Sequence, residues 1–188
     1  MRHARSFPPI EPAQARVLIL GSLPGQASLA AQAYYAHPRN AFWPILCAVL
    51  ERPAGLPYAD RVQALRDAGI ALWDVLAAAE RPGSLDADIV TSSVRVNDIA
   101  GLLARHPTLG LVICNGGSAH TLFRRHVLNS LGARADTLSV LRLPSTSPAH
   151  AALPFAHKLT TWRDALQPWL DQTPAQSCQD HAKLGAES

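Results

Sequence analysis

A short apolar strand that runs directly into a glycine-bracketed turn constrains this chain more than any other feature. Residues 17–20 are apolar throughout, and Gly21-Ser22-Leu23-Pro24-Gly25 follows at once. A strand that ends in such a turn places backbone N–H groups and small side chains at the carboxyl edge of a sheet, where open α/β proteins bind their ligands. The sequence therefore predicts an α/β fold with a site at this edge.

Further apolar strands alternate with helical segments along the chain. We expect strands at 70–73, 109–114 and 137–141, and helices at 40–50, 58–68, 97–105, 117–131 and 155–170. This alternation predicts a three-layer α/β/α sandwich with a mainly parallel central sheet of about four strands. The loops 21–25, 115–118 and 144–150 each follow a strand, so we expect them to meet at one edge of the sheet.

Length and composition set the expected organisation. A chain of 188 residues is long enough for one domain with a sizeable core. We expect a flexible lead over residues 1–12, a single domain over 13–171 and a disordered polar tail over 172–188. The chain has no apolar run of about 18 residues and no secretory signal, so we expect no membrane span and a location in a bacterial-type cytosol or nucleoid. We also expect a monomer.

Charge and cysteine usage narrow the chemistry. Lys158 and Lys183 are the only lysines among 17 basic residues, and the formal net charge is +3. Arginine suits phosphate contacts, but an arginine-rich composition also follows from a GC-rich genome, so the charge alone does not indicate DNA binding. Cys47, Cys114 and Cys178 are isolated, which excludes a four-cysteine zinc or iron–sulfur site. We expect no metal and no cofactor.

The densest group of functional side chains lies in residues 34–43, Tyr-Tyr-Ala-His-Pro-Arg-Asn-Ala-Phe-Trp. With the preceding Gly-Ser-Leu-Pro-Gly, this segment resembles the first active-site motif of the uracil-DNA glycosylase superfamily, and most closely that of its hypoxanthine-DNA (deoxyinosine) glycosylase branch. Further matches follow in order: Leu-Trp-Asp-Val at 72–75 with Arg-Pro-Gly-Ser-Leu-Asp at 81–86, Ile-Cys-Asn-Gly at 113–116, and Leu-Pro-Ser-Thr-Ser-Pro-Ala-His at 143–150. The resemblance spans about residues 17–165.

The resemblance implies a DNA glycosylase that hydrolyses the N-glycosidic bond of a deaminated base, with hypoxanthine preferred and DNA as partner. The base must leave the stack, at a cost of roughly a few kcal/mol. Stacking on an aromatic ring offsets about 1–3 kcal/mol of that cost. Tyr35 has the family position of the stacking aromatic, although a core tyrosine is the structural alternative. The scarcity of lysine favours water over an amine nucleophile, and therefore a monofunctional enzyme.

The same resemblance implies Asn40 as the catalytic residue, with His37 as second candidate for a hydrogen bond to the leaving base. Asn40 also precedes a helical pattern and can act as its N-cap, and the two roles are compatible. His37 precedes a proline and can simply pack against it. Many superfamily members carry Asp or Asn in the first turn, where this chain has Leu23.

Binding residues follow from the matched motifs. The base-binding set implied is Gly21, Ser22, Leu23, Tyr35, Ser84 and Asn115, and the DNA-binding set is Pro24, Gly25, Ser145, Thr146, Ser147, Pro148 and His150. Asp74, Arg81 and Asp86 lie in a stretch that faces the base in relatives, but a buried ion pair would explain them equally. Leu143 stands where the superfamily often has a histidine, which argues against strong uracil catalysis.

Three alternatives remain open. Uracil can be the main substrate, or the chain can bind lesions with little catalysis because the first turn lacks a polar residue. A third is a Rossmann-like nucleotide-binding enzyme with a phosphate at residues 21–25 and no DNA affinity. Against the third, this turn lacks the third glycine of the dinucleotide fingerprint and the Lys-Ser/Thr pair of a P-loop.

Overall fold

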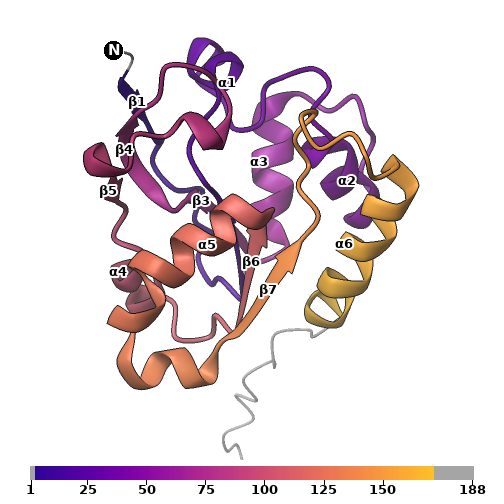
Figure 1. The fold of residues 1–188 in the computed structure, drawn as a ribbon. Helices are drawn as coiled ribbons and strands as arrows, with labels where there is room; N and C mark the ends of the chain where they lie inside the picture. Colours follow the sequence, from indigo (N-terminus) through magenta and orange to yellow (C-terminus); the bar gives the residue numbers. More distant parts are fainter. Residues whose placement is uncertain (1–2, 172–188) are drawn as a thin grey trace, which may run out of the picture.

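The computed structural model describes residues 3–171, and four parallel strands form its centre (Figure 1). They pair in the order β3-β2-β6-β7, where β2 is Val17–Gly21, β3 is Ile70–Asp74, β6 is Leu111–Asn115 and β7 is Ser139–Leu143. β2 and β3 are buried along their whole length, as expected of uniformly apolar central strands. The edge strand β7 is mostly exposed and carries polar residues. The predicted parallel sheet is confirmed.

Helices cover both faces of this sheet. One layer holds α2 (Phe42–Val49), α3 (Tyr58–Asp67) and α6 (Phe155–Leu170), and the other holds α4 (Ile99–Arg105) and α5 (Gly117–His126) (Figure 1). A shorter helix, α1 (Gln26–Ala31), follows the glycine turn. Phe42, Phe123 and Trp162 are fully buried between the helices and the sheet. The expected three-layer α/β/α sandwich is therefore confirmed.

A second sheet is absent from the expectations above. It is antiparallel, in the order β1-β4-β5, with β1 at His3–Arg5, β4 at Leu76–Glu80 and β5 at Arg95–Val96. β4 follows β3 after the single residue Val75, so the second sheet starts at the carboxyl edge of the first. Strands of two and three residues carry no readable alternation, and the pairing partners are far apart in the chain.

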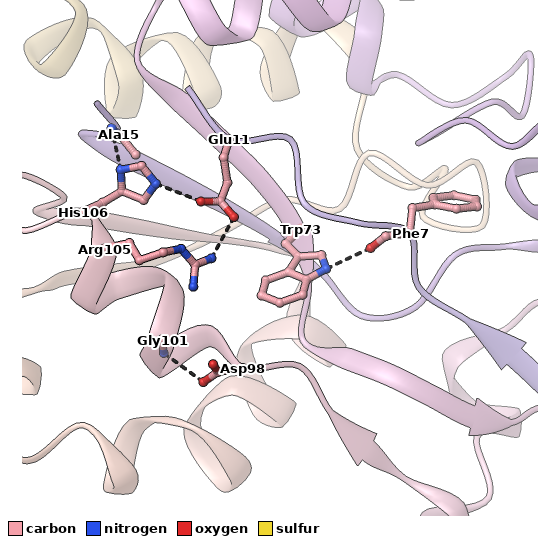
Figure 2. Close-up of polar contacts among 8 residues, drawn as sticks. All are labelled: Phe7, Glu11, Ala15, Trp73, Asp98, Gly101, Arg105 and His106. Atoms are coloured by element: carbon pink, nitrogen blue, oxygen red, sulfur yellow. Dashed lines mark hydrogen bonds and ion pairs between the residues drawn. The ribbon is translucent and has the colours of Figure 1, made fainter. Parts of the chain in front are cut away.

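The expectation of a flexible lead over residues 1–12 is wrong for its described part. β1 pairs with β4, and Ile10 is buried and forms a β-bridge with Leu72. The Trp73 indole N–H donates to the Phe7 carbonyl at 3.0 Å (Figure 2). The prolines of this segment favour the prediction of a loop, because proline lacks a backbone N–H. The residues beside them nevertheless pair with strands and pack in the core. The single domain at 13–171 stays a prediction, and the tail at 172–188 lies outside the described residues.

Glu11 fastens the same segment to α4 (Figure 2). Its carboxylate accepts hydrogen bonds from Arg105 at 2.8 Å and from His106 Nε2 at 3.0 Å. His106 Nδ1 in turn accepts from the Ala15 backbone N–H at 3.3 Å, so the ring connects the start of β2 to the end of α4. Burial alone would raise the pKa of Glu11, but these two partners outweigh it and hold the pKa below its usual value.

Two predicted helices have different ends. α4 begins at Ile99 because the Asp98 carboxylate caps it by accepting from the Gly101 N–H at 2.9 Å. α5 stops at His126, and 3-10 segments follow at Leu128–Ser130 and Gly132–Thr137, with Gly132 in the left-handed region at φ 54°. Shorter 3-10 turns occupy Asp86–Asp88 and Thr91–Ser93. No described helix has both the length and the apolar character needed to cross a membrane.

Candidate functional site

Gly21 allows two polar side chains to meet at the end of β2. An ideal Cβ on Gly21 would lie 2.4 Å from Asp74 Oδ1 and 2.9 Å from the Tyr35 hydroxyl oxygen. Any side chain here would displace one of them, because real Cβ contacts are longer than this. Gly21 and Asp74 are also direct partners in the β2–β3 ladder, so the sheet register fixes their proximity. Gly21, which is predicted to contact the nucleobase, therefore lies directly against the Asp74 carboxyl and the Tyr35 hydroxyl.

Arg81 holds the glycine turn in place. Its side chain is only 2% exposed, and its guanidinium donates to the backbone carbonyls of Leu23 and Pro24. Asp86 lies 3.7 Å from the same guanidinium and accepts a 2.7 Å hydrogen bond from the Ser22 hydroxyl. Burial lowers the pKa of Arg81, and Asp86 opposes this. The turn is therefore held by the buried Arg81 and its ion pair with the partly exposed Asp86, and the expected ion pair is present.

Tyr35 has an unusual backbone conformation and is half-buried. Its φ is +53°, in the region that non-glycine residues rarely adopt. The ring stacks on Phe42 with centroids 3.9 Å apart, at an interplanar angle of 21°. Its hydroxyl is buried without a hydrogen bond of good geometry in the described chain; burial and Asp74 raise its pKa above the usual range, and the nearby Asn115 side chain opposes the rise. Strain of this kind costs about 1–3 kcal/mol and is typical of functional sites.

Asp74 is a buried carboxyl beside that hydroxyl. It is 3% exposed and accepts a 2.9 Å hydrogen bond from the Ser6 hydroxyl. Burial raises its pKa to about 7, with Asp86 adding to the rise and Ser6 and Arg81 opposing it. Asp74 therefore changes its charge near neutral pH, at the position where β3 reaches the site.

Asn40 and His37 both have one side of their polar group engaged locally. The side-chain oxygen of Asn40, Oδ1, accepts a hydrogen bond from the Phe42 N–H at 3.0 Å, just before α2. His37 Nδ1 accepts from the Arg39 N–H at 3.1 Å, and the Asn40 N–H donates to the His37 carbonyl. The expectation that Asn40 is the N-cap is wrong, because α2 begins at Phe42 with Ala41 as its N-cap and the Asn40 contact belongs to the turn before the helix. The Asn40 amide N–H₂ and the His37 Nε2 have no partner in the described chain.

The loop after β7 is pinned to β6 and to the segment before α2. Asn115 donates from Nδ2 to the Thr146 hydroxyl and accepts from the Thr146 N–H, both at 2.9 Å. The Thr146 carbonyl accepts from the Ala41 N–H at 3.0 Å. A Cβ on Gly116, where φ is +96°, would lie 2.9 Å from Ser145 Cβ, so this glycine lets the two loops pack closely. These contacts join three distant segments at one edge.

Helix α6 holds both ends of the same loop. The Trp162 indole N–H donates to the Pro144 carbonyl at 3.0 Å, and the Lys158 ammonium donates to the His150 carbonyl at 2.8 Å. Lys158 is only 5% exposed, and burial lowers its pKa. Within the loop, the Ser145 and Ser147 oxygens accept from the N–H groups of Ser147 and Ala149. Their hydroxyl hydrogens are left to donate outward.

The structure brings together most of the predicted site residues. Those at the carboxyl edge are Gly21, Ser22, Leu23, Pro24, Gly25, Tyr35, Asn40, Asn115, Ser145, Thr146, Ser147 and Pro148. Ser84 is exposed, and no hydrogen bond within residues 3–171 joins it to them. His150 is exposed at the end of the loop and contacts Ser147 through its backbone N–H.

Sequence reasoning did not assign the residues that support the site. Lys158 and Trp162 lie four residues apart on the buried stripe of α6, and that spacing was the available signal. Asp74 and Arg81 lie within the matched motifs, but their spacing does not distinguish them from an ordinary ion pair. Within residues 3–171, no group of three or more His, Cys, Asp or Glu side chains is arranged to hold a metal ion.

Comparisons with known proteins agree on one family. A family model described as "Uracil DNA glycosylase superfamily" matches residues 8–166. A protein of Methanosarcina barkeri named hypoxanthine DNA glycosylase is 38% identical over 113 residues, which is 60% of this chain and 70% of that protein. A protein of the same name from Methanosarcina acetivorans is 37% identical over 116 residues, which is 61% of this chain and 72% of that protein.

A solved structure shows the same fold. It is the solution NMR structure of a Methanosarcina acetivorans protein described as a candidate uracil DNA glycosylase. The two structures superpose with a TM-score of 0.71 at 29% sequence identity, over 87% of this chain and 99% of the other.

Proposed function

Since this chain belongs to the uracil DNA glycosylase superfamily, we propose that it excises a deaminated base from DNA by hydrolysing the N-glycosidic bond, with hypoxanthine preferred. Both similar proteins named above are hypoxanthine DNA glycosylases. The observation that carries the proposal is the meeting of three loops beside the Tyr35 ring. The Asn115 side chain is hydrogen-bonded to Thr146, and the Thr146 carbonyl is hydrogen-bonded to the Ala41 N–H. Gly21 lies next to the Tyr35 hydroxyl. We also propose a cytoplasmic monomer.

Tyr35 is the surface on which the extruded base stacks. One side of its ring already rests on the fully buried Phe42, and the residue as a whole is half-buried. A ring supported in this way loses little entropy when a base packs against it. The stacking supplies about 1–3 kcal/mol toward the roughly few kcal/mol needed to remove a base from the duplex.

Asn40 stabilises the departing base. Its carbonyl oxygen is held by the Phe42 N–H, so the amide is oriented and its N–H₂ group is left to donate. Cleavage leaves negative charge on the purine, and a fixed donor aimed at that charge lowers the barrier. The second lone pair of the carbonyl oxygen can accept a hydrogen bond from the attacking water.

His37 adds a second donor to the leaving base. Because Nδ1 accepts from the Arg39 N–H, the neutral ring carries its hydrogen on Nε2. That hydrogen is available to a purine nitrogen or carbonyl oxygen. The ring therefore assists departure of the base without needing a positive charge.

The pinned loop 144–150 receives the DNA backbone. The hydroxyl oxygens of Ser145 and Ser147 accept hydrogen bonds inside the loop. Their O–H hydrogens can therefore donate to a phosphate oxygen of the DNA. Pro24 and Gly25, fixed by Arg81, lie at the neighbouring turn. Water is the nucleophile, because Lys158 is the only lysine in residues 3–171 and its amine donates to the His150 carbonyl.

Uracil excision as the main activity is the second candidate. The name of the family favours this candidate. Against it, Leu143 stands at the position where the superfamily often has a histidine, so one hydrogen-bond donor to the base is lost. A catalytically weak lesion binder is favoured by one feature, the buried apolar Leu23 in the first turn.

An excision assay separates these candidates. Duplexes carrying one deoxyinosine, one deoxyuridine or no lesion are incubated with the protein, and abasic sites are then cleaved with alkali. We expect strand breaks with deoxyinosine, fewer with deoxyuridine and none in the undamaged duplex. Breaks with deoxyuridine alone would favour the second candidate, and lesion binding without breaks would favour the inactive binder.

A further inference from the structure

A basic groove on the antiparallel sheet is not used by the chemistry above. It measures about 570 Å³ and lies over β1, β4 and β5; its lining includes Arg5, Ala78, Ser93 and Arg95. No residue predicted from the sequence to bind DNA lies in it. Its position beside the carboxyl edge makes it the strongest unassigned surface of the molecule.

The strand register builds the groove. Arg5 is paired with Ala78 across β1 and β4, and Ala78 is paired with Arg95 across β4 and β5. Directly paired residues point to the same face of a sheet, so two arginines stand on either side of one alanine. With strands about 4.8 Å apart, their Cα atoms are roughly 10 Å from each other. The small alanine leaves the trough between them open.

The two guanidiniums are available. Arg5 and Arg95 are exposed, and neither side chain has a hydrogen bond or ion pair within residues 3–171. The next row on this face pairs His3 with Glu80 at 3.4 Å, so the one carboxylate in the lining already has a cationic partner when His3 is protonated. The intervening Ala4 is 4% exposed and faces the opposite side. The groove is therefore net positive, and its two arginines are exposed on this face of the sheet.

The groove is also connected rigidly to the glycine turn. The Leu76 N–H donates to the Ser22 carbonyl at 3.1 Å, and Ala78 lies two residues further along β4, about 7 Å away. Arg81, just after β4, binds the carbonyls of Leu23 and Pro24. Figure 1 shows β1, β4 and β5 on the same side of the molecule as α1, the helix that leaves the turn.

We propose that Arg5 and Arg95 bind the phosphate backbone of the DNA outside the lesion, in the trough over Ala78. This rests on the proposed function for the identity of the polymer, and it adds a contact surface that the catalytic loops do not supply. Guanidinium groups bind phosphate oxygens through two parallel hydrogen bonds, and charge complementarity favours this occupant over an apolar segment. Ser92 at the rim adds a hydroxyl donor, whereas the Ser93 hydroxyl already donates to the Val90 carbonyl at 2.7 Å.

The test measures affinity for undamaged duplex, so that it does not depend on excision. Arg5→Gln/Arg95→Gln is compared with Arg125→Gln/Arg163→Gln, which removes two exposed arginines from α5 and α6. We expect the groove variant to bind roughly 10-fold more weakly near 0.1 M salt, with a salt-dependence slope lower by about one to two. The control pair should change affinity less than about threefold.

A second pair of variants tests the trough itself. Ala78→Glu places a carboxylate between the two arginines, while Ala78→Gln has the same size without the charge. We expect Ala78→Glu to lose at least as much affinity as the double arginine variant and Ala78→Gln to lose little. Equal losses in the two arginine pairs, or equal losses in the two Ala78 variants, would overturn the proposal. Excision of deoxyinosine at saturating protein should be unchanged in all folded variants, and its absence in the wild type would refute the proposed function instead.

Discussion

The two edges of the parallel sheet treat their polar groups in opposite ways. At the amino edge, Glu11, Arg105 and His106 satisfy one another, and the Ala15 N–H is bonded as well (Figure 2). At the carboxyl edge lie the two buried side-chain polar atoms that lack a partner among residues 3–171, the Tyr35 hydroxyl and Arg81 Nε. An unsatisfied buried group costs about 1–3 kcal/mol. The fold is thus consolidated at one edge and held ready for a ligand at the other.

The largest test of this contrast is Asn40→Ala at the carboxyl edge. We expect the single-turnover excision rate to fall about 10²- to 10³-fold, because a fixed donor to the developing charge is lost. Unfolding free energy should fall by about 1 kcal/mol or less, the value of one helix-start contact. Asn129→Ala is the matched control, since Asn129 is exposed beyond α5. An Asn40→Ala enzyme with full activity would refute the catalytic assignment.

Asp74→Asn tests the same edge through pH. Burial raises the folded pKa of Asp74 to about 7 from 3.8, so the folded state binds this proton more tightly than the unfolded chain. Stability from this group is therefore complete below about pH 4 and declines as pH rises toward 7, by about 4 kcal/mol at most. The asparagine variant should lose that part of the pH dependence in thermal unfolding from pH 4 to 8. Parallel pH profiles for wild type and variant would contradict this account, and Asp164→Asn, an exposed site, is the control.

Glu11→Ala tests the amino edge. We expect a loss of about 1–3 kcal/mol of unfolding free energy, because His106 Nε2 is left buried without its acceptor. Glu11→Gln keeps an acceptor oxygen and should lose less. Because the pKa of Glu11 is lowered, its ionic contribution is present above pH 4.5 and disappears as pH falls. Deoxyinosine excision should be unchanged in both, and a selective loss of activity in either would break the division between the two edges.

Tyr35→Phe gives the smallest expected effect and sharpens the contrast. The substitution removes a buried hydroxyl that has no partner, while the ring that stacks on Phe42 remains. We expect unfolding free energy to be equal or higher by about 1 kcal/mol. Tyr58→Phe is the control, because its hydroxyl accepts from the Tyr34 N–H at 3.0 Å and its removal should destabilise. A destabilised Tyr35→Phe protein would show that the hydroxyl is bonded.

The parts of the fold that follow from sequence are those with local signals. Residues 17–20 form a strand because they are uniformly apolar, and the helix predicted at 155–170 is found over those residues as α6. β1 could not be predicted, because three residues are too few to show an alternating pattern. Its partner is also distant in the sequence, since His3 pairs with Glu80. Long-range pairing of very short strands depends on the assembled core rather than on propensity.

The candidate site divides in the same way. The resemblance to the glycosylase motifs selected Tyr35, Asn40 and the loop 144–150, and the structure brings them to one edge. Spacing did not show which atoms are already engaged: the Asn40 side-chain oxygen accepts from the Phe42 N–H, and Asn115 supports Thr146. The roles of these residues toward DNA stay predictions. Burial creates the high pKa of Asp74, and burial is a property of the whole fold.

The loop at 144–150 is fastened at its beginning, middle and end, by Trp162, Asn115 and Lys158. A segment already held in one shape has little freedom left to lose when it meets a nucleic acid. Contact with DNA therefore spends little of its favourable energy on ordering this loop.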